Sequence, residues 1–585
     1  MSDKAGAPSG QRPWWPAGTV FRRTDVALLG LVALVGILAA FAVRFFEELI
    51  DLSLEFGFHL LPEHLGYAAY LIYPALLGLL VAGVKLLVRK PDRQHSVPLV
   101  IVAMDKRGGR IHPASTLLKT LAAMLTLGAG GSLGREGPVV LLGGGVGSAV
   151  GQMLRLRPEW ISTLVAAGAG AAIATAFSAP ITGVFFAMEI VLIQFSTRTF
   201  ALVAVACVTA AQVSGLIYGS PSFPIPAYQL NNPWEILLYV GLGLAITVLS
   251  RVYIRVIYGS EELGARHLTA LPAWIKPALG GIAFGAVAIF LPRTLGGGYP
   301  TITDALAGKL TIGLMALLLV GKLVTIGLTS GSGWPGGVFT PALYLGSMAG
   351  GLYGWAAASL LPAIVPQPGA YAVVGMAAMI AGSTHAPLTA MTLIFEVTRD
   401  YRIALPAMVA CGIAAVFSQR LDPYSIDTVH LPEHGILLPW QVRDLRHVTV
   451  ERAMCREVHS VRIDMELKDV IRVMQLHRHG GYPVLDSDSR LAGMITLRDV
   501  REVPLNQRLT TPVTEVMTRQ VSVLTPDQTL ADAASLMAHQ GVGRLPVVHP
   551  DDRTQVIGIL SRSDVLRSYP TDISLDEQDE MFLER

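Results

Sequence analysis

An apolar segment that ends in a glycine-rich turn and a proline occurs twice in this chain, over residues 119–138 and 322–341. When the two copies are aligned at one fixed offset in residue number, their glycines coincide. Most of the other residues differ between the copies. Matched glycines without matched side chains indicate that backbone geometry was duplicated. Two interrupted apolar helices, one in each half, predict a site built from broken membrane helices. The matched pairs are Gly128 and Gly331, Gly130 and Gly333, Gly134 and Gly337, Pro138 and Pro341, Gly143 and Gly346, Gly147 and Gly350, and Gly151 and Gly354.

The charged residues are few and unevenly spread. They make up 15% of the chain, whereas soluble domains carry roughly 25%, and the last quarter of the sequence holds nearly half of them. An apolar membrane body is therefore followed by a soluble part of ordinary polarity. The net charge of +2, without basic runs, gives no reason to expect a nucleic-acid partner. Three scattered cysteines suit neither a disulfide framework nor a metal site.

Further matches between the two halves set the domain boundaries. Pro180 matches Pro387 and Glu189 matches Glu396, and within the tail residues 493–500 return as residues 558–565. We expect an all-α polytopic membrane body of short, tilted and re-entrant helices, followed by an α+β tail. The expected parts are an N-terminal segment (1–25), a first membrane repeat (26–220), a connector (221–234), a second repeat (235–430), a linker (431–448), two tail units (449–506 and 507–570) and an acidic end (571–585).

Basic residues precede the first apolar run of the chain. Arg12, Arg22 and Arg23 lie just before residues 26–43, and no small-residue cleavage site follows that run. We therefore expect an uncleaved first membrane helix with a cytoplasmic N-terminus. The soluble tail is expected on the same side, and the plasma membrane is the expected location.

Two motifs in the matched turns resemble a known family. Residues 134–138, GREGP, and residues 337–341, GVFTP, resemble signatures of the CLC family of chloride channels and proton-coupled chloride transporters. Tyr424 resembles that family's central-gate tyrosine, and the tail resembles a tandem CBS pair. The resemblance implies the CLC fold, with two inverted repeats, and a homodimer in a lipid bilayer that has one pore per subunit. Chloride is the implied substrate ion, and no cofactor is required.

The two turns have the chemistry of an anion path. A helix N-terminus supplies about half a positive charge and free N–H groups, and it holds an anion less tightly than a lysine does. The N–H groups of Val338 and Phe339 are the leading candidates. By resemblance, Tyr424 and a residue of the 94–98 turn complete the site; that turn lacks the family's glycines, so both His95 and Ser96 remain candidates. The other expected anion-binding residues are Gly134, Arg135 and Gly337.

Glu136 is expected to be a protonatable gate. Its carboxylate lies where the dipoles of the two turns converge, so it competes with chloride, and protonation or displacement by chloride releases it. The alternative is an Arg135–Glu136 ion pair in an aqueous loop, and the matching turn in the second half favours the gate. Glu189 and Glu396 are interpreted as caps or paired groups at helix ends. Lys119 and Lys322 are interpreted as helix-end residues that extend to water.

Position 190 bears on the kind of transport. The proton-transfer glutamate of many CLC exchangers aligns with Ile190, which cannot relay a proton, so the sequence favours a gated passive chloride channel. A proton-coupled chloride antiporter is the close alternative. A CBS-regulated divalent-cation transporter is a distant one, because its path should carry clustered carboxylates. An enzyme is not expected, since neither an HExxH motif nor a set of Cys and His residues with metal-ligand spacing occurs in the sequence.

The tail has two hydroxyl–carboxylate pairs at matching positions. Thr496 with Asp499, and Ser561 with Asp564, resemble the CBS positions that hold the ribose of an adenine nucleotide such as ATP, ADP or AMP. The alternative is that both pairs cap helices and that the tail stabilises a dimer. The sequence leaves both interpretations open.

Overall fold

A computed structural model describes most of the chain as two compact units, Met1–His430 and Leu431–Arg585. Outside the described residues lie His95, the predicted acidic end 571–585, and most of the N-terminal segment 1–25, the connector 221–234 and the linker 431–448. The described residues are 23–87, 96–219, 232–267, 271–362, 364–365, 368–432, 436, 445–477, 479–504, 507–508 and 510–568.

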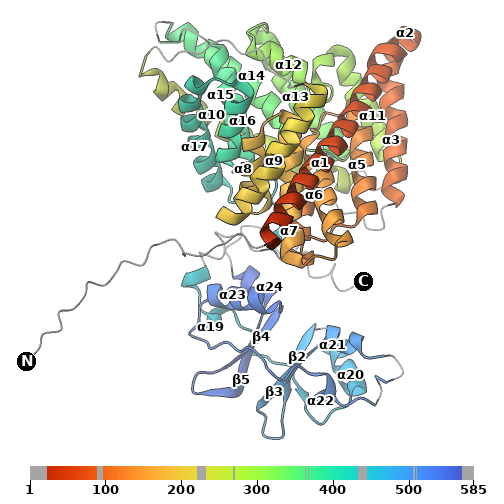
Figure 1. Ribbon diagram of the computed structural model, residues 1–585, viewed down its shortest axis with the longest axis vertical. Coiled ribbons are helices and arrows are strands. Elements are labelled where there is room, and N and C mark those ends of the chain that lie inside the picture. The colour runs from red at the N-terminus through yellow and green to blue at the C-terminus, as the bar shows by residue number, and fades with distance from the viewer. Residues whose placement is uncertain are drawn as a thin grey trace, which may run out of the picture. The chain divides into compact units, whose positions relative to one another are not determined.

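The first unit is helical, and apart from the short α2 the order of its helices repeats (Figure 1). The first half contains α1 (Arg23–Glu55), α2 (Leu61–Leu65), α3 (Ala69–Leu87), α4 (Ser96–Arg107), α5 (Pro113–Gly128), α6 (Glu136–Met153), α7 (Pro158–Phe177), α8 (Pro180–Phe186), continued by a π-helical turn (Ala187–Val191), and α9 (Thr197–Tyr218). The second half contains α10 (Glu235–His267), α11 (Lys276–Phe290), α12 (Tyr299–Leu306), α13 (Ile312–Gly331), α14 (Phe339–Leu360), α15 (Gly369–Thr384), α16 (Pro387–Thr398) and α17 (Ala404–Leu421).

The matched glycines lie where helix backbones touch. A Cβ atom added to Gly143 of α6 would collide with the carbonyl oxygen of Gly168 in α7. The equivalent pair in the second half, Gly346 of α14 and Gly375 of α15, has the same close approach. Small residues at such crossings let membrane helices pack backbone to backbone. The duplicated glycines therefore fix the same helix crossing in both halves.

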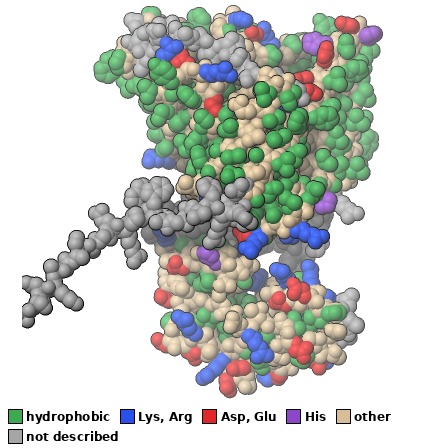
Figure 2. Space-filling view, in the orientation of Figure 1, with side chains coloured by type: hydrophobic (Ala, Val, Ile, Leu, Met, Phe, Trp, Pro, Cys, Tyr) green, Lys and Arg blue, Asp and Glu red, His purple; other side chains and the backbone are tan. Residues whose placement is uncertain are grey.

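The surface of the first unit suits a bilayer. Hydrophobic side chains cover much of its visible face (Figure 2). Long, apolar α-helices satisfy their own backbone hydrogen bonds, as a bilayer requires. Within the described residues, the stretches that are long and apolar enough to cross a membrane are Ala27–Leu87, Pro158–Phe177, Thr197–Ile217, Glu235–His267, Ile312–Gly331 and Tyr401–Leu421.

The second unit contains two small sheets with helices against them. In the first sheet β2 lies between a parallel β1 and an antiparallel β3, and the second sheet is the β4–β5 hairpin. Backbone pairs from Cys455 to Ile559 and from Met494 to Thr518 cross between the two halves of this unit. The elements are α19 (Val450–Ala453), β1 (Val461–Arg462), α20 (Leu467–His477), β2 (Gly481–Leu485), β3 (Leu491–Thr496), α21 (Leu497–Glu502), α22 (Val513–Val516), α23 (Leu530–Gln540), β4 (Arg544–His549), β5 (Asp552–Ser561) and α24 (Arg562–Arg567).

Candidate functional site

The two glycine turns meet at the centre of the helical unit. The Gly134 amide donates to the Gly337 carbonyl at 2.6 Å, and the Gly337 amide donates back to the Gly134 carbonyl at 2.7 Å. This is an isolated antiparallel pair between equivalent positions of the two repeats. Reciprocal pairing of equivalent residues is what a twofold axis between the halves produces, as inverted repeats require.

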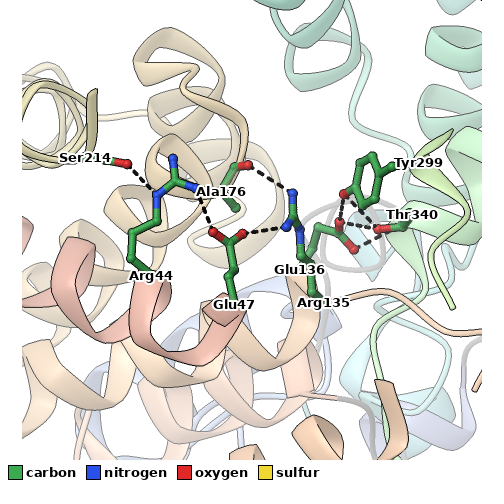
Figure 3. Close-up of polar contacts among 8 residues, drawn as sticks. All are labelled: Arg44, Glu47, Arg135, Glu136, Ala176, Ser214, Tyr299 and Thr340. Atoms are coloured by element: carbon green, nitrogen blue, oxygen red, sulfur yellow. Dashed lines mark hydrogen bonds and ion pairs between the residues drawn. The ribbon is translucent and has the colours of Figure 1, made fainter. Parts of the chain in front are cut away.

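Glu136 begins α6, and its buried carboxylate reaches across to the first turn of α14 (Figure 3). One carboxylate oxygen accepts from the Thr340 amide at 3.1 Å. The other accepts from the Tyr299 hydroxyl at 2.8 Å and from the Thr340 hydroxyl. Amide donors at a helix N-terminus bind an anion, so the carboxylate takes the place that a free anion would take there.

A small cavity lies beside this carboxylate, with a volume of about 10 Å³. Four of the predicted residues, Ser96, Gly337, Val338 and Phe339, line it together with Glu136. The last two begin α14, where helix N–H groups have no partner within the helix. The remaining lining residues are Val97, Gly137, Phe186, Thr384 and Asp427.

The three other predicted anion-binding residues that the structure describes are not among the lining residues of the cavity. Gly134 leaves room for the Glu136 side chain, because a Cβ atom there would collide with the Glu136 carboxylate. Tyr424 is buried but is not among the lining residues, whereas Asp427, three positions later, is. The proposed role of Tyr424 therefore stays a prediction. The third residue is Arg135, whose side chain pairs with Glu47.

Arg135 belongs to a chain of charged side chains that includes Glu47 and Arg44 (Figure 3). Its guanidinium pairs with Glu47 of α1 at 2.9 Å, and Glu47 pairs in turn with Arg44 at 2.9 Å. The Arg135 guanidinium also lies over the Tyr299 ring, 4.6 Å from its centroid. The Arg135 side chain is 25% exposed and has Glu47 as its counter-charge, so the anion-binding role of Arg135 stays a prediction.

The prediction for Lys322 is wrong. Its side chain does not extend to water but is fully buried. The ammonium donates to the carbonyls of Thr294 at 2.9 Å and Gly296 at 2.5 Å. An ammonium group has three donors and is costly to bury without acceptors. Lys322 therefore fixes the turn that leads into Tyr299, one of the residues that hold the gate.

Glu189 and Glu396 cap helices of the opposite half, which confirms their structural interpretation. The Glu189 carboxylate accepts from the amides of Leu388 and Thr389 at 3.1 and 2.7 Å, and from the Thr389 hydroxyl at 2.7 Å. The Glu396 carboxylate accepts in the same way from Ile181 and Thr182, at 2.8 and 2.7 Å, with the hydroxyl at 2.6 Å. These caps satisfy the open N–H groups of α16 and α8.

The hydroxyl–carboxylate pairs of the tail both act as helix caps. The Thr496 hydroxyl donates to Asp499 at 2.7 Å, and the Ser561 hydroxyl donates to Asp564 at 2.6 Å. In each pair the carboxylate also accepts from the backbone amide of the hydroxyl residue at 2.8 Å. The pairs thus have the capping geometry of the alternative interpretation, and nucleotide binding is left as a proposal.

Three histidine rings stack beside the second of these pairs. The His459 ring lies 3.8 Å from His477 and 5.5 Å from His479, measured between centroids. Burial, and then the nearby charges of Arg544 and the other two histidines, lower the pKa of His479. Protonation of His479 is therefore less favourable in the folded tail than in an unfolded chain.

We expect the tail to lose stability as the pH falls. A histidine whose pKa is lowered by folding contributes stability above its unfolded value, near 6.5, and this is lost as the pH drops through the folded value. Hydrogen exchange of β2 in the full-length protein, corrected for intrinsic rates, should show less protection at pH 5 than at pH 7. His479→Gln should flatten this dependence, and the same change at exposed His539 should not. Equal protection at both pH values would contradict the expectation.

Sequence reasoning missed Tyr299, Thr340 and Glu47. Tyr299 follows the glycine turn 296–298, which matches residues 94–96 in the first half. Since residues 94–98 were predicted to contribute to the site, this match could have indicated that the segment around Tyr299 contributes as well. Thr340 is the variable residue of the GVFTP motif. Glu47 with Arg44 is a charge pair in an apolar helix, a pattern that marks a functional or structural site in membranes. No group of three or more His, Cys, Asp or Glu side chains in the described part of the chain is placed to hold a metal ion.

The fold and site define a polytopic membrane protein whose two inverted repeats meet at a buried carboxylate. The profile of the voltage-gated chloride channel family matches residues 77–419, and the CBS domain profile matches residues 445–506 and 513–571. The chain belongs to the voltage-gated chloride channel family and carries a tandem CBS tail. The resemblance read from the sequence and the expected fold class are thereby confirmed.

Individual relatives include both channels and exchangers by name. A putative chloride channel protein ClcB-like from Ralstonia nicotianae is 34% identical over 70% of this chain and 99% of the relative. The H(+)/Cl(-) exchange transporter ClcA of Salmonella paratyphi A is 32% identical over 68% of this chain and 87% of the relative. Among solved structures, a slow cyanobacterial Cl-/H+ antiporter has a TM-score of 0.63 and 26% identity, over 70% of this chain and 97% of the antiporter chain.

Proposed function

We propose that this protein exchanges chloride for protons across a membrane, with Glu136 as both gate and proton carrier. The observation that carries the proposal is the Glu136 carboxylate, which occupies the anion position at the N-terminus of α14. One group that both blocks an anion path and binds a proton couples the two ions. Ile190 favours a passive channel, but the exchange transporter and the antiporter among the relatives favour coupled exchange, which therefore replaces the channel as the preferred function.

The mechanism follows from the contacts of the gate. The ionised carboxylate is held by donors from two elements, Tyr299 and Thr340. A proton removes the charge that these donors stabilise, so the side chain is released and chloride can take its place beside Val338 and Phe339. When the proton leaves to the other side, the carboxylate returns and closes the path. Ser96 at the cavity, and Tyr424 by resemblance, complete the proposed anion site.

Assembly and regulation are also proposed. The family resemblance supports a homodimer in the plasma membrane, with both termini in the cytoplasm. An adenine nucleotide is proposed at Ser561 and Asp564, where the positive charge of nearby Arg544 would suit its phosphates. Binding of labelled ATP, ADP and AMP to full-length protein, and its loss in Asp564→Asn, tests the nucleotide part.

The test of exchange uses purified protein in liposomes loaded with chloride and placed in low external chloride. We expect chloride to leave when valinomycin carries the balancing charge, and protons to move against their gradient when no protonophore is present. A pH electrode outside the liposomes records the proton movement. Chloride efflux without uphill proton movement would overturn exchange and restore the passive channel.

A further inference from the structure

The residue at the family's usual position for an inner proton-transfer group cannot carry a proton to Glu136. The position where the family resemblance places a proton-transfer glutamate holds Ile190, whose apolar side chain is buried. The adjacent Glu189 is committed to capping α16 through both carboxylate oxygens. If the protein moves protons, as proposed above, another group must receive them on the way to Glu136.

Among the described residues, four carboxylates are buried, at Glu47, Glu136, Glu235 and Asp427. Glu47 is paired with two arginines. Glu235 accepts hydrogen bonds from the hydroxyls of Tyr239 and Tyr371. Asp427 differs from both because it lines the same small cavity as Glu136.

Asp427 is held in place by hydrogen bonds of the segment that follows α17, at the end of the helical unit. It lies in a turn after α17, and its neighbour Ile426 donates from its amide to the Ser383 carbonyl near the end of α15 at 2.9 Å. The Asp427 amide donates to the Ser425 hydroxyl at 3.3 Å. Its side chain is 5% exposed. These contacts fix the turn that carries Asp427, which lines the cavity.

Charge interactions connect the two carboxylates. The buried Tyr253 hydroxyl donates to the Val338 carbonyl, and both Asp427 and Glu136 lie close enough to interact with this hydroxyl electrostatically. Both carboxylates thus lie near the Tyr253 hydroxyl of α10. The cavity volume of about 10 Å³ is roughly what one water molecule needs.

We propose that Asp427 is the inner proton-transfer residue, which passes protons to Glu136 through the cavity they share. Asp427 takes a proton from the inner side and becomes neutral. It then gives the proton, by way of one water molecule, to the Glu136 carboxylate and becomes ionised again. When Glu136 is released and chloride takes its place, that chloride would favour the protonated form of Asp427, because two negative charges close together repel each other. Chloride entry and proton entry are thereby coupled.

The test compares variants of the full-length protein in the liposome experiment described above. Asp427→Asn has nearly the same shape but cannot carry a proton, so we expect proton transport to fall by about a hundredfold, as for loss of a proton-transfer group, while chloride efflux continues. Asp427→Glu should restore proton transport. The matched control is Asp422→Asn, in the same segment, where the carboxylate pairs with Arg251 and does not line the cavity; it should keep its coupling.

The outcomes separate this inference from the proposed function. Wild-type protein that moves no protons overturns both. Wild-type protein that pumps protons, together with an Asp427→Asn variant that pumps equally well, overturns the role of Asp427 and leaves exchange standing. If Asp427→Asn does not fold, Asp427→Ser removes the carboxylate with a smaller side chain, and undiminished coupling in that variant overturns the inference in the same way.

Discussion

Replacing Glu136 with glutamine will abolish proton transport while chloride efflux from liposomes continues. Glutamine has nearly the same shape but binds no proton, so it cannot carry one across. It also lacks the charge that strengthens the hydrogen bonds from Tyr299 and Thr340. A hydrogen bond to a charged group contributes about 1.5–3 kcal/mol, against about 1 kcal/mol for a neutral one. Chloride efflux in Glu136→Gln should therefore be at least as fast as in the wild type and independent of pH.

The control for this experiment is the same change at Glu55, which is exposed at the end of α1 and should leave both ion movements unaltered. Tyr299→Phe provides a graded test, because it removes one hydrogen bond from the gate. Loss of that bond should make release of the carboxylate easier by roughly tenfold. Proton transport that persists in Glu136→Gln, or a folded variant that passes no chloride, would contradict the gate.

Replacing Glu189 or Glu396 with alanine will strongly destabilise the membrane body. Each change leaves two amides and one hydroxyl of the opposite half without their acceptor. In each cap the threonine amide and hydroxyl are part-buried, and a buried donor that loses a charged acceptor costs about 1–3 kcal/mol, so the free energy of unfolding should fall by about 2 kcal/mol or more. Thermal denaturation of the detergent-solubilised protein, followed by size-exclusion chromatography, measures the change.

The inverted arrangement gives this second experiment an internal control. Because the two caps are equivalent, Glu189→Ala and Glu396→Ala should lower the denaturation temperature by similar amounts. Glu159→Ala, an exposed glutamate in the first turn of α7, should change it little. A variant as stable as the wild type, or a large effect at only one of the two positions, would show that the caps do not hold the halves together.

Much of the fold and part of the site could be predicted from the sequence. The duplicated turns indicated two halves and placed Glu136 where two helix starts converge, because glycine spacing reports backbone geometry directly. The polar partners of the gate could not be found in this way. Tyr299 is 163 positions from Glu136 in the sequence, and only the folded chain brings them together.

The two lysines at matching positions of the repeat show a further limit of prediction from the sequence. Lys119 and Lys322 occupy matching positions and have the same apolar flanks, so the sequence assigns them the same role. In the structure Lys322 is fully buried against backbone carbonyls, whereas Lys119 is partly exposed. A pattern of apolar residues says that a lysine lies on a membrane helix. It does not say whether carbonyls of another segment are available to bind the ammonium.

The paired glycines of the two turns restrict how this protein can move ions. Many transporters with repeated halves work by rocking one half against the other around a fixed site. Here such rocking would break the mutual hydrogen bonds of Gly134 and Gly337 together with both carboxylate caps. In the proposed mechanism the moving part is accordingly reduced to side chains such as Glu136, while the scaffold stays still. Turnover then depends on how often the Glu136 side chain changes its rotamer and gains or loses its proton. Spectroscopic probes on α6 and α14 should keep a constant separation throughout the transport cycle.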